Sequence, residues 1–305
     1  MVISILEVKV VFDVNAFLKD YVERPTGKVV KWIKENVEKR REQKLDESKF
    51  KFITRLFGIE DKVGLRPGGE HPAFENYLHP DDREALFYIT GLINNPKLKA
   101  HQKWIGIVDP AYNIICLGGP VSNFITRQNM GYQRRGDDFL KVSDFPIDFP
   151  FLFDLSKERS RQITKRYTGG KVHKEYNWPI ITPSGLLNSK VTKGWLEENY
   201  LIITRMPNLS NEIAWKERKD LIIISGTHGT GTRALELLFE TAKVLKSIVE
   251  EVGEACYYQS LLRVPEIIHD TQWHDSLPLR IEHIKSEPLL IKDDRINFWF
   301  KKMKG

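Results

Sequence analysis

The chain has 305 residues, of which 41% are hydrophobic and 29% are charged. This is an ordinary globular balance that allows a sizeable buried core. The net charge of +6 is spread over the whole chain and is too dilute to indicate a dedicated nucleic-acid binder.

Cysteine usage and hydropathy bear on where the protein works. Cys116 and Cys256 each lie in an apolar run, so we expect buried thiols in a reducing compartment and neither a disulfide nor a metal site. No run of 18 apolar residues occurs, and Glu7 and Lys9 stand where a signal peptide needs an apolar core. We therefore expect a cytoplasmic protein that makes no membrane contact.

Residues 1–100 are expected to form a mainly helical region after a first strand at residues 3–12. Residues 27–43 place apolar side chains on one helical stripe, with lysine and arginine elsewhere. We interpret the basic face as a solvated surface, and contact with a nucleic acid or a membrane surface is the alternative. Residues 59–80 are rich in Gly, Pro and His and predict a long loop or a domain junction. The next helix is expected to start at Pro80.

The pattern changes after residue 100. Residues 114–117 and 221–225 are unbroken apolar runs, typical of parallel strands buried on both faces. A 3.6-residue period predicts one long helix over residues 230–252, ended by Gly253, and this helix would join two strands in a βαβ unit. Further strands are expected at residues 200–205, 255–264, 279–284 and 296–301.

The predicted fold class is α/β. A Rossmann-like, mostly parallel sheet flanked by helices would form a ligand-binding domain over residues 101–305, preceded by the mainly helical region of residues 1–100. The last strands are open to antiparallel addition at one edge of the sheet.

The first of two glycine-rich turns is LGGPVSN, residues 117–123. Gly118 and Gly119 directly follow a predicted strand and let the backbone approach a ligand without a Cβ in the way. Ser122 or Asn123 is expected to cap a helix whose free amides would face an anion. These four residues are predicted to bind the ligand.

The second turn, GTHGTGT, follows the strand at residues 221–225 and opens the long helix. Its glycines, threonine hydroxyls and helix N-terminus suit a phosphate. Its spacing matches neither GxGxxG nor a P-loop, so ATP hydrolysis of the P-loop type is not expected. The predicted ligand-binding residues of this turn are Gly226, Thr227, Gly229, Thr230, Gly231 and Thr232.

Three further side chains are candidates for the chemistry. His228 stands between glycines and is suited to donate to phosphate or to act as a general acid or base. Glu236 is the candidate carboxylate of an enzyme, and an ion pair on the helix is its structural alternative. Arg205 ends a predicted strand and is expected at the same carboxyl edge; its alternative is a salt bridge with Glu212 or Asp220. No metal site is expected, because the histidines lack an organised spacing.

Three motifs in fixed order, D-x-x-Y-N-I-I-C-L-G-G-P-V-S-N, N-Y-L-I-I-T-R-M-P-N and L-I-I-I-S-G-T-H-G-T-G-T, resemble an uncharacterised group of prokaryotic Rossmann-like domains from signalling or defence contexts. The resemblance covers roughly residues 104–285 and implies a ligand-binding domain. More loosely, G-T-G-T-R-A-L-E is similar to the P-G-G-x-G-T-x-x-E motif of the LOG phosphoribohydrolases and their nucleotide-sensing SLOG relatives. This likeness implies a nucleotide or NAD-related ligand.

Three functions therefore stay open. The first is a sensor or effector subunit in prokaryotic signalling or antiviral defence that binds a phosphate-bearing nucleotide at both turns. The second is a nucleotide N-glycosidase or NAD-processing hydrolase that uses Glu236 and His228. The third is a subunit that binds a protein or nucleic-acid partner through its N-terminal region, with glycine turns that are only structural.

Overall fold

A computed structural model describes residues 63–67, 80–93, 99–100, 112–156, 158–159, 161–166, 172–270 and 275–304. The strand predicted at residues 3–12 and the basic helix predicted at residues 27–43 lie outside these ranges.

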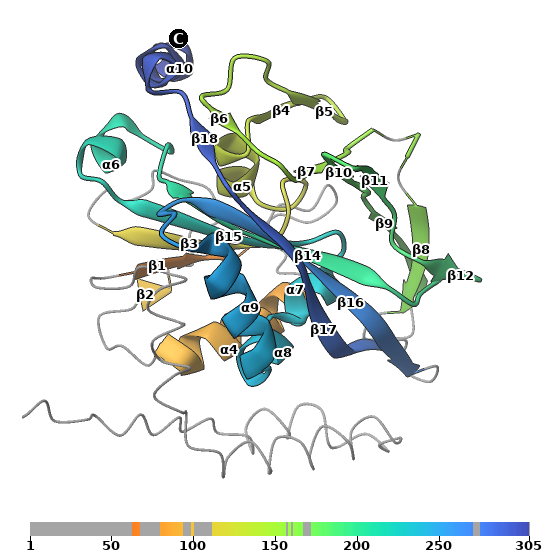
Figure 1. The fold of residues 1–305 in the computed structure, drawn as a ribbon. Helices are drawn as coiled ribbons and strands as arrows, with labels where there is room; N and C mark the ends of the chain where they lie inside the picture. Colours follow the sequence, from red (N-terminus) through yellow and green to blue (C-terminus); the bar gives the residue numbers. More distant parts are fainter. Residues whose placement is uncertain are drawn as a thin grey trace, which may run out of the picture.

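A seven-stranded mixed sheet in the order β17-β16-β14-β15-β3-β1-β2 forms the centre of the molecule (Figure 1). Strands β2, β1, β3 and β15 run parallel, whereas β14, β16 and β17 each pair antiparallel with their neighbours. The strand bounds are β1 (Val63–Arg66), β2 (Lys99–Ala100), β3 (Asn113–Leu117), β14 (Asn199–Pro207), β15 (Asp220–Gly226), β16 (Tyr258–Asp270) and β17 (Asp275–Pro288).

The predicted Rossmann-like, mostly parallel sheet is therefore wrong. β14 lies between β15 and β16 and is antiparallel to both, so the expected βαβ unit does not join neighbouring strands. The error has a physical cause. Eight of the nine residues of β14 are buried, and burial on both faces produces an unbroken apolar run in either strand direction.

Small antiparallel sheets extend from the central one, and the Rossmann-like prediction did not foresee them. They pair β4 with β5, β8 with β9, β12 with β13, β18 with β6, and β10 with both β7 and β11. Their bounds are β4 (Tyr132–Arg135), β5 (Asp138–Lys141), β6 (Ile147–Asp148), β7 (Leu152–Phe153), β8 (Arg161–Arg166), β9 (Val172–Asn177), β10 (Ile180–Thr182), β11 (Gly185–Leu187), β12 (Val191–Thr192), β13 (Trp195–Leu196) and β18 (Leu290–Ile291).

Helices cover both faces of the central sheet (Figure 1). One face carries α4 (Pro80–Ile93), α7 (Gly229–Arg233), α8 (Leu235–Glu240) and α9 (Ala242–Val252), and the other carries α5 (Phe124–Asn129), α6 (Glu212–Lys216) and α10 (Asp293–Lys304). Each face has its own apolar core. Neighbouring residues of one strand enter different cores, because side chains alternate across a strand.

Several helix predictions can be compared directly. The helix start at Pro80 and the helix end at Gly253 are confirmed. The single helix predicted for residues 230–252 is instead three helices, α7, α8 and α9. The strand predicted at residues 296–301 is wrong, since these residues lie in α10.

The region before residue 101 contributes to the central sheet. β1 lies within the loop predicted at residues 59–80, and it pairs with both β2 and β3. Among the described residues, no helix has the length and apolar character needed to cross a bilayer.

The two cysteines differ in exposure. Cys116 is buried as predicted, whereas Cys256 is exposed, which corrects the expectation of a second buried thiol. Burial raises the pKa of the Cys116 thiol, so this side chain is poorly suited to act as a nucleophile.

Candidate functional site

The two glycine-rich turns lie side by side, because β3 and β15 are neighbouring parallel strands. Leu117 is paired with Ile224 at the ends of these strands. The Gly118 amide then donates a hydrogen bond of 3.0 Å to the Ile224 carbonyl. Both turns therefore lie at the end of the sheet that the carboxyl ends of the parallel strands form, the carboxyl edge.

The chain leaves this edge in two directions. The helix after β3, α5, lies on one face of the sheet, whereas α4 after β1 and α7 after β15 lie on the other (Figure 1). Divergence of the chain at the carboxyl ends of neighbouring parallel strands is the arrangement at which open α/β sheets bind ligands. We therefore treat this edge as the candidate site.

Asn123 builds the first turn. Its Oδ1 accepts hydrogen bonds from the amides of Ile125 and Thr126 at 3.0 and 3.2 Å, which caps α5 as predicted. Its Nδ2 donates to the carbonyls of Arg66 and Leu117 at 3.0 and 2.9 Å. All four of these hydrogen bonds join the Asn123 side chain to backbone groups of the protein itself.

Oxygen atoms surround the two glycines of this turn. A Cβ on Gly118 would lie 2.8 Å from Asp82 Oδ2 and 3.0 Å from Ser122 Oγ, and Gly118 also has a φ of +96°, which favours glycine. A Cβ on Gly119 would lie 3.1 Å from Ser225 Oγ. Carboxylate and hydroxyl groups thus line the place that side chains would otherwise fill.

Ser225 is the last residue but one of β15. Its side chain is fully buried, and its hydroxyl has no hydrogen-bond partner among the described residues. An unsatisfied buried hydroxyl costs about 1–3 kcal/mol. No hydrogen bond within the described part of the chain offsets this cost.

The second turn is held tightly by its own packing. A Cβ on Gly226 would lie 2.6 Å from the amide nitrogen of Thr232, and one on Gly231 would lie 2.5 Å from the Tyr200 carbonyl. The Thr227 amide donates to that same carbonyl at 3.0 Å, and the Gly226 amide donates to Thr232 Oγ1 at 3.0 Å. Much of this turn is therefore explained by the close approach of α7 to β15.

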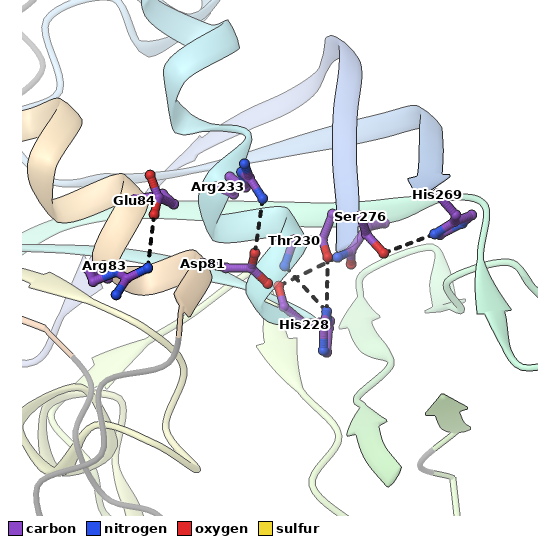
Figure 2. A network of polar contacts seen from close by, with 9 residues as sticks. Asp81, Arg83, Glu84, His228, Thr230, Arg233, His269 and Ser276 are labelled. Carbon is purple, nitrogen blue, oxygen red and sulfur yellow. Dashed lines mark hydrogen bonds and ion pairs between the residues drawn. The ribbon is translucent and has the colours of Figure 1, made fainter. Parts of the chain in front are cut away.

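His228 caps α7. Its Nδ1 accepts a hydrogen bond from the Thr230 amide at 3.3 Å and lies 3.2 Å from Thr230 Oγ1 (Figure 2). A neutral ring that accepts at Nδ1 carries its proton on Nε2, an assignment made from these hydrogen bonds. The ring is nearly buried, and the hydrogen bond from the Thr230 amide orients it.

A buried ion pair lies beside the cap. Asp81 of α4 is 3.7 Å from Arg233 of α7, measured from Oδ1 to Nη1, and Figure 2 shows this pair close to Thr230 and His228. Two more buried arginines border the edge, Arg66 at the end of β1 and Arg127 in α5. Burial lowers the pKa of Arg66.

Arg205 lies elsewhere, which corrects its predicted place. β14 is antiparallel to β15, so the end of β14 pairs with the start of β15 through Pro207 and Asp220. Arg205 forms a salt bridge of 2.7 Å with Asp220 at that opposite edge. This contact is the salt bridge with Asp220 that was given as the structural alternative to ligand binding by Arg205.

The remaining predicted residues divide between two helices. Gly229, Thr230, Gly231 and Thr232 form α7. Glu236 is half-buried in the first turn of the separate helix α8, so it is not part of the glycine turn itself.

Sequence reasoning missed Asp81, Asp82 and Ser225 as members of this edge. The two aspartates carry only a helix-start signal in the sequence, and the serine simply ends an apolar run. Asp82 lies beside Gly118 and Ser225 beside Gly119, because segments far apart in the chain come together through the pairing of β1 and β15 with β3. In the described parts of the chain, no three His, Cys, Asp or Glu side chains gather in a metal-binding group.

Comparisons with protein-family models, curated proteins and solved structures give no match.

Proposed function

We propose that the protein binds a nucleotide-derived, phosphate-bearing ligand at the carboxyl ends of β3 and β15, as the sensing or effector part of a signalling or defence system. The observation that carries this proposal is the Ser225 hydroxyl. It is buried between the two glycine turns and has no hydrogen-bond partner among the described residues. A ligand oxygen that accepts from this hydroxyl would recover the lost hydrogen bond.

The charge around the edge supports an anionic ligand. Arg66 ends β1, and Arg127 donates to the Pro120 carbonyl at 3.2 Å in the first turn, whereas Arg233 is paired with Asp81. Guanidinium groups suit phosphate because of their planar set of donors. His228 belongs to the same turn, where its Nδ1 caps α7. Gly119 adds room, since a backbone without a Cβ lets a ligand come close.

We propose binding and not hydrolysis. In the N-glycosidase alternative, His228 assists as a base and Glu236 supplies the carboxylate. His228 Nδ1 already accepts from the helix amide of Thr230, and Glu236 belongs to the next helix. The arrangement of both side chains therefore favours a static role.

A thermal-shift screen with AMP, ADP, ADP-ribose, NAD and cyclic AMP tests the proposal. A ligand present at one hundred times its Kd raises the free energy of unfolding by about 2.7 kcal/mol, so the Tm should rise by several degrees. Ser225→Ala should leave the ligand-free protein equally or more stable, because it removes an unsatisfied hydroxyl. It should weaken binding about tenfold, the effect of one lost hydrogen bond.

Ser260→Ala is the matched control. Ser260 is equally buried but lies on β16, and its hydroxyl bonds Ser286 Oγ at 2.7 Å. This variant should lose about 1 kcal/mol of stability and keep the full ligand response. The proposal fails if no nucleotide shifts the Tm of the wild type, or if Ser225→Ala binds as tightly as the wild type does.

A further inference from the structure

Asn177, the last residue of β9, lies beside the second glycine turn. The amide of the next residue, Trp178, donates a hydrogen bond of 3.2 Å to the Thr227 carbonyl. Consecutive Cα atoms are about 3.8 Å apart, so this bond holds Asn177 close to the turn. β9 pairs with β8 in a small sheet of its own, and the bond to Thr227 ties its end to the candidate site.

The side chain of Asn177 points into the protein. Successive side chains of a strand point to opposite sides. Tyr176, the residue before it, is 52% exposed, whereas Asn177 is 1% exposed. The Asn177 carboxamide therefore lies on the side of β9 that faces the body of the molecule.

This carboxamide is unmatched at both ends. Oδ1 and Nδ2 of Asn177 are buried, and neither has a hydrogen-bond partner among the described residues. Two other buried asparagines at the turns are satisfied by the protein. Asn123 bonds four backbone groups, and Asn199 accepts from the Tyr200 amide at 2.8 Å and donates to the His228 carbonyl at 3.5 Å. An unpaired donor and acceptor on one carboxamide suit a ligand group that is itself both acceptor and donor.

An adenine base offers this combination on one edge. Its 6-amino group is a donor and its neighbouring N7 is an acceptor, and an asparagine side chain pairs with both at once. Guanine presents only acceptors, O6 and N7, on the same edge, so the Asn177 oxygen would face another oxygen. Ser225, where we place the phosphate end, is two residues before Thr227, which is at most about 7 Å along the chain. One nucleotide can therefore span both places.

We propose that Asn177 selects adenine as the base of the bound nucleotide. Its Oδ1 accepts from the 6-amino group, and its Nδ2 donates to N7. This inference rests on the proposed function and deepens it, because it names the base of the ligand and the residue that reads it. A base that lacks either group leaves a buried polar atom of Asn177 unpaired, and such a loss gives strong discrimination.

Calorimetric titration of ADP and of inosine diphosphate (IDP) into the full chain tests the inference. IDP carries an oxygen in place of the 6-amino group. The wild type should bind ADP at least about tenfold more tightly than IDP, which is about 1.4 kcal/mol. Asn177→Leu keeps a similar shape without the carboxamide, so it should bind ADP and IDP equally. The ratio of the two affinities is a readout that a purely structural role of Asn177 would not change.

Asn208→Leu is the matched control. Asn208 is also buried, but it follows β14 at the opposite edge of the sheet, where its Oδ1 accepts from the Ser210 amide at 3.0 Å. This variant should be less stable and should keep the preference of the wild type for ADP.

A comparison of ADP with 7-deaza-ADP, in which a C–H group replaces N7, needs no variant. The wild type should bind 7-deaza-ADP about tenfold more weakly than ADP, because Nδ2 of Asn177 then stays unpaired. This measurement tests the inference even if Asn177→Leu does not fold.

The outcomes separate the two proposals. If the wild type binds GDP, IDP, CDP or 7-deaza-ADP as tightly as ADP, or if Asn177→Leu keeps the preference for ADP over IDP, the inference about Asn177 is overturned and nucleotide binding stands. If none of these nucleotides and none of the earlier panel binds, the proposed function is overturned, and the inference about Asn177 falls with it.

Discussion

Among single residues, Lys141 lies in an unusual environment. Its Nζ is 5.4, 4.8 and 5.0 Å from the ring centroids of Tyr132, Phe145 and Phe149, and it donates to the Met130 carbonyl at 2.5 Å. The residue as a whole is exposed, although aromatic rings lie on several sides of its amine. Burial lowers the pKa of Lys141 to about 7, although Asp148 acts in the opposite direction.

This lowered pKa predicts how stability depends on pH. A lysine in the unfolded chain has a pKa of about 10.4, so between about pH 7 and pH 10 the unfolded state holds a proton that the folded state has lost. The free energy of unfolding should therefore rise with pH in this window, by less than the full effect of a buried amine because Lys141 is exposed and solvent screens its charge. Urea unfolding of the wild type and of Lys141→Met at several pH values measures this pH dependence. The variant should lack the part of the rise that comes from the lysine.

The exposed Lys301 of α10 provides the control for that measurement. Lys301→Met should keep the pH dependence of the wild type. Equal slopes in the wild type and in Lys141→Met would show that the folded protein does not depress the amine's pKa.

Among the elements, helix α10 replaces the strand that the sequence predicted at residues 296–301. In a strand, Ile296, Phe298 and Phe300 would share one face. In the helix, Ile296, Trp299 and Phe300 are buried, whereas Phe298 is 57% exposed. Trp299 also packs edge-on against Phe145, with ring centroids 4.9 Å apart.

Trp299→Ala should therefore lower the free energy of unfolding by about 3–5 kcal/mol, the usual cost of removing a large buried aromatic side chain. Phe298→Ala, at the exposed position just before Trp299, should change the free energy of unfolding by no more than about 0.5 kcal/mol. Chemical denaturation followed by circular dichroism compares the two. A larger loss for Phe298→Ala would contradict the helical phase of this segment.

Across the whole molecule, the central sheet joins the two cores. Ile222 and Ile224 of β15 enter one core, and Leu221 and Ile223 enter the other. Because alternate side chains of this one strand pack into both cores, the two cores share the backbone of β15 and should unfold together.

Ile222→Ala and Ile223→Ala should each cost about 2–5 kcal/mol and should shift the same unfolding transition. Tryptophan fluorescence and far-UV circular dichroism should report coincident curves for both variants. Ile213→Ala, at an exposed position of α6, should leave the curve close to that of the wild type. Two separated transitions would show that the cores unfold independently.

The sequence by itself determined the features that depend on neighbouring residues. The apolar runs predicted β3, β14 and β15 within one or two residues of their bounds. The Asn123 cap and the helix end at Gly253 follow from side-chain and backbone chemistry at single positions. The two glycine turns were placed correctly along the chain for the same reason.

Only the tertiary structure decided strand direction and the membership of the site. An unbroken apolar run has the same appearance in a parallel and an antiparallel strand, so nothing local revealed that β14 reverses and carries Arg205 to the far edge. Ser225 lies beside Gly119 because β15 pairs with β3, and Asp82 of the helix after β1 lies beside Gly118. Such contacts are long-range, and propensity and periodicity within one segment carry no information about them.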